Sequence, residues 1–138
     1  MKPMKGYTIP ITKEMVTAQT DLRASTKAAL SVCRRLNRHG FANAIEFAEK
    51  LTKKEVSIDG KYHDKTAKGI LRMLKGLEAN AKNRDMDAAK MRLNISVHNG
   101  PKLMRGRRNR HHGMRLKNTF VQAVLIPLAE KKKEENKR

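Results

Sequence analysis

The chain has 138 residues, and its 32 Lys and Arg against 13 Asp and Glu give a formal net charge of +19. This length suits one domain that buries roughly two-thirds of its unfolded surface, and this charge is best tolerated beside a polyanion, with nucleic acid the first candidate and an anionic membrane the second. One Cys excludes an internal disulfide, two Tyr and three Phe supply no base-stacking platform, and no apolar run approaches a membrane span, so we expect a soluble intracellular protein.

An extended arm and two helices are predicted for the first third of the chain. Residues 1–20 carry two of the four prolines and show no sustained period, so we expect an extended or irregular arm ahead of a single domain over 21–130. Apolar side chains then recur at helical spacing over 25–37, and Gly40 is placed to end this helix. A second helix follows at once, with one apolar stripe from Phe41 to Leu51.

The longest predicted helix covers residues 64–83. It follows a loop that turns at Asp59-Gly60, and Asp64 is expected to cap its first turn. Gly69 and Gly76 each cost this helix roughly 1 kcal/mol relative to Ala, and in return they allow the backbone of a protein or a nucleic acid to approach closely.

The apolar period changes to two in the last third of the chain, after a short helical turn in RDMDAAK at 84–90. MRLNISVH at 91–98 alternates apolar and polar side chains, and TFVQAVLIPL at 119–128 is rich in β-branched residues, so two partner strands are predicted. Helices followed by strands indicate an α+β fold, with about three helices packed on one face of a small antiparallel sheet. Residues 131–138 have nothing to bury, and we expect them to be disordered.

A basic segment, KLMRGRRNRHHGMRLK at residues 102–117, lies between the two strands. Sixteen residues are too many for an ordinary hairpin loop, so the segment is either disordered or extends the strands as a protruding hairpin over about 99–118. No Asp or Glu occurs over 88–129, and Arg suits bidentate contact with phosphate. The predicted nucleic-acid contacts in the segment are Lys102, Arg105, Arg107, Arg108, Arg110, His111, His112, Arg115 and Lys117.

The helices add basic faces of their own. Phosphate contacts are also expected from residues on the polar sides of the first and third helices, namely Lys27, Arg34, Arg35, Lys65, Lys68 and Arg72. The usual parts of DNA-binding proteins, such as zinc spacings and heptad zippers, do not occur. A thin Arg-rich ribbon can contact the backbones of neighbouring helices, which favours structured RNA over duplex DNA.

Two residues invite an enzymatic interpretation. Adjacent His111 and His112 could act as acid and base or as metal ligands, but a nuclease would want carboxylates nearby and the surrounding Arg would repel a cation. Cys33 lies on the apolar stripe of the first helix and is expected to be a core thiol. The sequence therefore predicts neither an enzyme nor a cofactor or metal site.

Several stretches, taken in order, resemble one family. They are LRMLKGLEANAKNRDMD at 71–87, LNISVHNGPKLMRGRRNRHHGMRL at 93–116 and FVQAVLIPLAEK at 120–131. Together they are similar to the universal large-subunit ribosomal protein family number twenty-two, called seventeen in eukaryotes. The matching elements are the helix ending Glu78-Ala79-Asn80-Ala81, the strand exit Asn99-Gly100-Pro101, and Arg110, His112 and Gly113. Upstream, DLRASTK at 21–27 resembles the start of the family's first helix and points to Leu22, Arg23 and Lys27, of which Arg23 and Lys27 are expected to bind RNA.

The resemblance implies a structural constituent of the large subunit in the cytoplasm, with roles in assembly and translation. Its body would sit on rRNA near the peptide exit, beside neighbouring ribosomal proteins, and its hairpin would line the nascent-peptide tunnel. The residues expected at the tip, near the nascent chain, are Arg110, His111, His112, Gly113 and Met114. No membrane and no small-molecule substrate are implied. The alternatives are a free-standing basic protein that coats nucleic acid and, for contrast, a metal-dependent nuclease.

The chain departs from the family pattern in two places. Archaeal and eukaryotic members usually carry a glycine-rich insertion between the second and third helices, and only SIDGKYHDKTAK at 57–68 stands there. The family's RAHGR reads RHHGM at 110–114, so Met114 replaces a basic residue at the tip. Both departures suggest a shortened archaeal or eukaryotic-type member.

Overall fold

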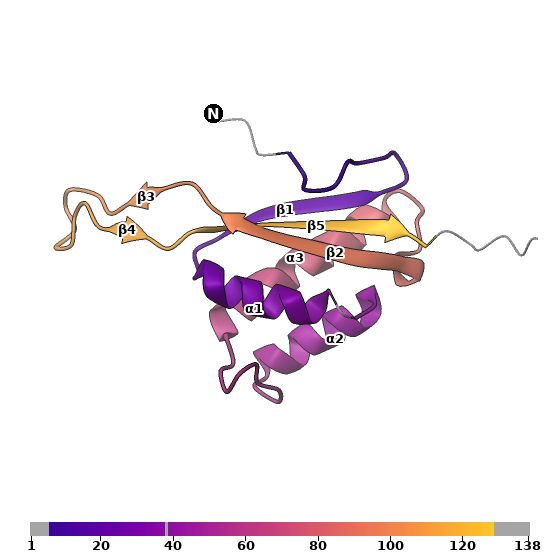
Figure 1. Ribbon diagram of the computed structural model, residues 1–138, viewed down its shortest axis with the longest axis horizontal. Coiled ribbons are helices and arrows are strands. Elements are labelled where there is room, and N and C mark those ends of the chain that lie inside the picture. The colour runs from indigo at the N-terminus through magenta and orange to yellow at the C-terminus, as the bar shows by residue number, and fades with distance from the viewer. Residues whose placement is uncertain (1–5, 38, 129–138) are drawn as a thin grey trace, which may run out of the picture.

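A computed structural model describes residues 6–37 and 39–128 (Figure 1). Three helices lie on one side of a three-stranded antiparallel sheet, which confirms the predicted α+β class. In chain order the elements are β1 (Val16–Leu22), α1 (Thr26–Leu36), α2 (Phe41–Thr52), α3 (Asp64–Lys82), a 3₁₀ turn (Ala88–Lys90), β2 (Met91–Asn99), β3 (Leu103–Met104), β4 (Arg115–Leu116) and β5 (Thr119–Pro127).

The sheet has the order β1-β5-β2, with the last strand of the chain in its centre. β5 pairs antiparallel with β1 from Leu22↔Thr119 to Val16↔Leu125, and with β2 over all nine residues of each strand. β1 takes in residues 16–20 of the predicted extended or irregular arm, so the last quarter of that arm belongs to the sheet. Its inward side chains at 16, 18, 20 and 22 do alternate, but two of them are Ala and Thr, so the apolar signal is weak.

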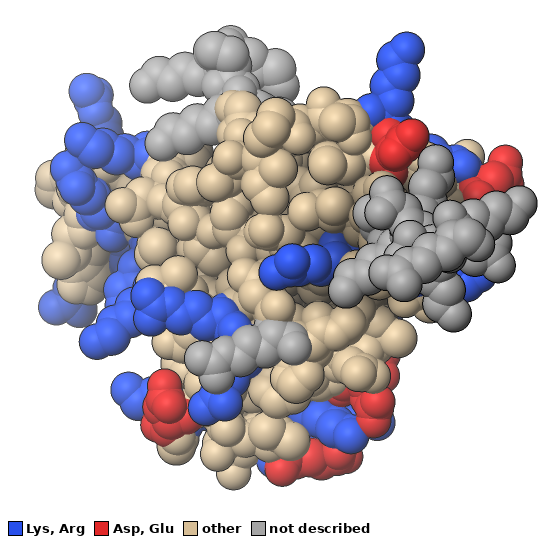
Figure 2. Space-filling model, turned by 45° about the vertical axis from the view of Figure 1, so that its right-hand side comes forward, with Lys and Arg blue, Asp and Glu red and all other residues tan. Residues whose placement is uncertain are grey.

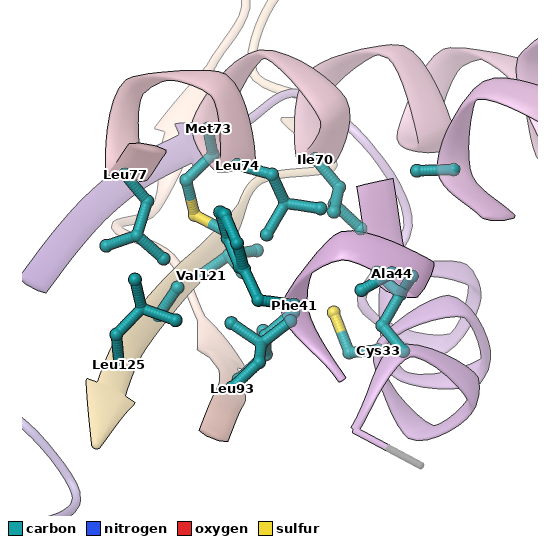
Figure 3. Close-up of a cluster of buried hydrophobic side chains, with 14 of the residues drawn as sticks. Cys33, Phe41, Ala44, Ile70, Met73, Leu74, Leu77, Leu93, Val121 and Leu125 are labelled. Carbon is teal, nitrogen blue, oxygen red and sulfur yellow. The ribbon is translucent and has the colours of Figure 1, made fainter. Parts of the chain in front are cut away.

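The hydrophobic core lies between the sheet and the helices (Figure 3). Val121 and Leu125 of β5 and Leu93 of β2 point toward α3, whose Ile70 and Leu74 meet them across the core. α3 packs against β1 and α2, and α1 packs against β2. This arrangement follows from an apolar stripe on each helix and from period-two patterning on the strands.

The opposite face of the sheet is covered as well. Phe120, Gln122 and Val124 of β5 point away from the helices and are nonetheless buried. Gln122 Nε2 donates to the backbone oxygen of Gly6 at 2.9 Å, and Thr8 Oγ1 lies 3.0 Å from His98 Nε2 on β2. Residues 6–15 thus run along this face (Figure 1), and burial on both faces explains why β5 is apolar almost throughout.

The helix bounds lie within one residue of the predicted ones, but Gly40 is the N-cap of α2 and does not end α1, whose C-cap is Asn37. A second difference lies at the start of α3. Its N-cap is His63, which has a left-handed backbone with φ 46°, and Asp64 is the first helical residue. Asp64 Oδ2 accepts from Lys68 Nζ at 3.3 Å rather than from the helix backbone, so the predicted cap is wrong. The preceding turn forms as predicted, with Asp59 and Gly60 at positive φ.

Two predictions concern residues outside the described ranges. The start of the arm, including Pro3, and the expected disordered tail at 131–138 lie there. None of the helices in the described ranges is both long and apolar enough to cross a membrane.

Candidate nucleic-acid interface

The basic segment begins where the pairing of β2 with β5 ends, at Asn99↔Thr119. Gly100 N donates to Asn118 O at 3.1 Å, and a Cβ at Gly100 would lie 2.7 Å from Asn118 Nδ2, so the two strands remain close here. The segment then projects past the end of the sheet, clear of the helices (Figure 1). Both of its ends are therefore fixed to the folded body.

Strand pairing within the segment is short. β3 and β4 pair only at Leu103↔Leu116 and Met104↔Arg115. Pro101 has no N–H to donate, which helps to explain the break in the ladder between this pair and the main sheet. The structure thus forms a two-residue ladder where a continuous ribbon over about 99–118 was one of the predicted alternatives.

The tip is closed by its own backbone bonds. Arg105 N donates to Met114 O at 3.0 Å, and Gly113 N donates back to Arg105 O at 3.2 Å. Asn109 organises the turn between them, because its Oδ1 accepts from His111 N and its backbone oxygen accepts from His112 N, both at 3.0 Å. Gly113 has φ +75°, a conformation that glycine adopts without strain.

All nine predicted contacts in the basic segment are exposed, as are Met104 and Met114. Leu103 and Leu116 are half-buried and face each other across the β3–β4 pair. The segment therefore presents its cations to solvent over a small apolar contact. This geometry suits binding to an extended polyanion that approaches from outside the body.

A second group of predicted residues meets in an open groove of about 260 Å³. Arg23 follows β1, and Lys65, Lys68 and Arg72 lie on the first half of α3. Asp21 is the one acidic residue in the groove lining. Gly69 lies in the same lining against the Leu22 side chain, where an added Cβ would come 2.5 Å from a methyl carbon.

The groove and the basic segment lie at the same end of the sheet, since Leu22 pairs with Thr119. The start of α1 is also there: Thr26 Oγ1 lies 3.1 Å from Asn99 Oδ1 and 3.0 Å from Thr119 Oγ1, which brings Lys27 to the base of the segment. Arg34 and Arg35 are exposed in the last turn of α1, away from this end. The structure thus brings most of the predicted residues together, but not these two.

Ion pairing divides the charged residues by type. Each of the five salt bridges among the described residues uses a Lys, and none uses an Arg. Lys68 is the only predicted contact in such a pair, with Asp64. In Figure 2, Lys and Arg without neighbouring acids gather along the left of the view, whereas Asp and Glu at the bottom and upper right lie next to further Lys and Arg. The Arg side chains at the basic end therefore have no carboxylate partner to displace among the described residues.

Acidic residues on α2, on the second half of α3 and on the turn that follows are paired with Lys. Glu46, Glu49, Glu78 and Asp87 each pair with a Lys, and the 2.6 Å bond from Lys50 lowers the pKa of Glu46 and raises that of Lys50. A mainly apolar open hollow of about 400 Å³ lies on this part of the surface, lined in part by Phe41, Ile45 and Met86. The charge of the protein is therefore strongly asymmetric.

The residues considered for catalysis differ in solvent exposure. His111 and His112 are exposed at the tip, whereas Cys33 is buried, and burial raises the pKa of its thiol to about 12. Within residues 6–37 and 39–128 no group of three or more His, Cys, Asp and Glu side chains could hold a metal ion.

Sequence reasoning missed the residues that position the basic segment. Asn109, Asn118 and Thr26 hold its tip and base, and their only sequence signal is that Asn and Thr favour turns and helix starts. Comparison with protein-family models and with curated proteins finds no match to this chain.

Proposed function

We propose that this protein is a structural constituent of the large ribosomal subunit that binds rRNA with its basic segment. The observation that carries the proposal is an exposed, acid-free segment with seven Lys and Arg that is held at both ends by a sheet. A flexible basic tail would give attraction without position, whereas this anchorage directs the cations to a fixed place.

Charge and shape together favour structured RNA as the ligand. The projecting segment is two strands wide and carries five Arg and two Lys. It can contact phosphates of RNA helices on either side. The second basic group, in the groove at the same end of the sheet, would let the body rest on the same RNA. The proposed role is therefore architectural, in subunit assembly and translation, without catalysis.

The resemblance in sequence supports a more specific location. The described residues of these stretches, 71–87, 93–116 and 120–128, fall on the second half of α3, on β2 with most of the basic segment, and on β5. In the proposed arrangement the tip from Arg110 to Met114 lines the nascent-peptide exit tunnel, and the body contacts neighbouring ribosomal proteins. Met114 makes this tip less basic than the family pattern and gives it an exposed apolar side chain.

A sucrose gradient of cell lysate at high salt tests the proposal. We expect the protein in the large-subunit and whole-ribosome fractions after the salt wash, because an integral subunit protein is held by many contacts and by shape. Release into the light fractions would favour the alternative, a free-standing protein that coats nucleic acid through charge alone.

A pair of variants links the association to the basic segment. Arg107→Gln/Arg108→Gln removes two exposed charges near the tip and should reduce recovery in the large-subunit fractions. Lys53→Gln/Lys54→Gln removes two exposed charges after α2 and should leave recovery unchanged. Equal recovery of both variants would mean that the basic segment does not hold the protein on the subunit.

A further inference from the structure

We infer that the groove lined by Arg23, Lys65, Lys68 and Arg72 is a second binding site for RNA backbone phosphates, and that Asp64 competes with RNA for it by holding Lys68. The inference rests on the proposed function in that RNA is the ligand, but it concerns a different surface from the basic segment. Arg23 is more than 40 residues from α3 in the sequence, and the fold brings the two together in the groove.

The groove has the composition of an anion site. Four cations and one acid line about 260 Å³ of open space. Lys65, Lys68 and Arg72 follow one another at intervals of three and four residues, which places neighbouring Cβ atoms roughly 5–6 Å apart on one face of a helix. Arg23 faces this row from the end of β1, so cations stand on two sides of the space a phosphodiester would occupy.

The floor of the groove is fixed by packing. Leu22 inserts its side chain against Gly69, close enough that any Cβ there would force it to move. Arg23 is the next residue after Leu22, and Leu22 is paired with Thr119 in the sheet. The backbone that carries Arg23 is therefore held against α3 before RNA arrives, which lowers the cost of ordering the site on binding.

Asp64 forms an ion pair with one of the groove cations, Lys68, in the free protein. Its Oδ2 lies 3.3 Å from Lys68 Nζ, while its Oδ1 is buried and has no hydrogen-bond partner among the described residues. Both side chains of the pair are more than a third exposed, and such pairs contribute at most about 1 kcal/mol. A phosphate can therefore take Lys68 from Asp64 at small cost, and removal of the carboxylate should make binding tighter.

Position explains why two sites are useful. The groove and the base of the basic segment share one end of the sheet. An RNA that contacts the segment brings its own backbone near the groove, so the second contact forms at high effective concentration. The two sites together would set the orientation of the body as well as its attachment.

Binding of a fluorescently labelled stem-loop RNA to the full chain, measured between about 50 and 200 mM salt, tests the site. Arg23→Gln/Arg72→Gln should weaken binding about tenfold and make the slope of log affinity against log salt shallower by about 1.5, for two lost phosphate contacts. The control Lys53→Gln/Lys54→Gln removes the same charge outside the groove and should change the slope little. Equal slopes for the two variants would overturn the inference.

The competing role of Asp64 has a test of opposite sign. Asp64→Asn should tighten RNA binding about two- to fivefold, because Lys68 is freed. Asp59→Asn removes the same charge in an exposed turn at positive φ, which Asn tolerates, and should have a smaller effect. If Asp64→Asn binds no more tightly than Asp59→Asn, Asp64 is not a competitor.

Two further measurements separate the possible outcomes. Inorganic phosphate at millimolar concentration should not displace the RNA from the groove; displacement would indicate a small-anion site instead of a backbone site. Recovery of Arg107→Gln/Arg108→Gln with the large subunit reports on the proposed function separately. A groove variant with unchanged RNA binding would therefore refute this inference and leave the ribosomal assignment standing.

Discussion

Two glycines in α3 differ in what surrounds them, although the sequence gives both the same expectation of close approach. Gly69 faces the Leu22 side chain, so the approaching group is part of the protein itself. An added Cβ at Gly76 would meet nothing within 4 Å, and Gly76 is exposed on the helix surface. Only Gly69 is therefore required by the packing of the body.

The two glycines should respond differently to substitution by Ala. Gly76→Ala should raise the free energy of unfolding by about 0.5–1 kcal/mol, because Ala is the better helix former and nothing obstructs its methyl group. Gly69→Ala should gain less or lose stability, since the Leu22 side chain must move from a contact of 2.5 Å. Urea unfolding of both variants measures the difference. A larger gain from Gly69→Ala would contradict the packing at this site.

Cys33 should make stability fall with pH above its ordinary pKa. Burial raises the pKa of the thiol from 9.0 to about 12, so the folded protein keeps the proton that the unfolded chain releases. The contribution of the protonated thiol to the free energy of unfolding is therefore complete below pH 9. It declines between pH 9 and about 12, by about 1.4 kcal/mol per pH unit. Urea unfolding at about pH 8 and about pH 10, under reducing conditions, should show a drop larger by about 1.4 kcal/mol for the natural protein than for Cys33→Ala.

Asn37, the C-cap residue of α1, connects the end of this helix to β2. Asn37 Oδ1 accepts from Ile95 N at 2.7 Å, and its Nδ2 donates to Ile95 O at 2.9 Å. β2 is an edge strand, and Asn37 thus satisfies both backbone groups of Ile95, as a neighbouring strand would.

Asn37→Ala should therefore destabilise the protein by about 1–3 kcal/mol, because both backbone groups of Ile95 lose their partner in a partly buried place. Asn83→Ala serves as a control, since Asn83 ends α3 in the same helical conformation and its side chain forms no hydrogen bond with a described residue. Chemical unfolding of the two variants gives the comparison. Equal stabilities would mean that water replaces Asn37 at no cost.

The elements that were predicted correctly share a strong local pattern. α1, α2 and α3 each carry an apolar stripe, and β2 alternates with residues as apolar as Leu93 and Ile95. β1 was missed because its inward positions include Ala18 and Thr20, and its strand is specified by pairing with β5. The cap of α3 was wrong because His63 adopts a left-handed conformation that its type does not signal.

The candidate site was predictable only in part for a similar reason. Residue type and the absence of acids identify the basic segment, since those features are local to the sequence. The proximity of Arg23 to α3 depends on how β1 packs against that helix. The five Arg and two Lys of the basic segment do not by themselves indicate which cations lack an ion-pair partner. Tertiary packing decides both, and no periodicity encodes it.

At the scale of the whole molecule, the charge distribution separates two surfaces. Four of the five ion pairs lie on α2, the second half of α3 and the turn that follows, whereas at the end with the basic segment and the groove only Lys68 has such a partner among the described residues. Repulsion among the excess positive charges destabilises the free protein, and these charges are concentrated where an RNA would neutralise them. In the proposed assembly, the surface with paired charges would contact other proteins.

This asymmetry predicts that salt stabilises the free protein. A net charge of +19 repels itself within the folded state, and salt at about 0.1 M screens charges beyond roughly 10 Å. The five salt bridges would be weakened too, but each is exposed and contributes at most about 1 kcal/mol. The free energy of unfolding should therefore rise by on the order of 1 kcal/mol from low to physiological salt.

A variant with four Arg replaced by Gln in the basic segment, at 105, 107, 108 and 110, tests the cause of this effect. It lowers the formal charge from +19 to +15 at exposed positions outside the core, so its stability should depend less on salt. Urea unfolding of both proteins across the salt series measures the two slopes. A fall in stability with salt would mean that the ion pairs outweigh the repulsion, and equal slopes would mean that the repulsion does not come from the basic end.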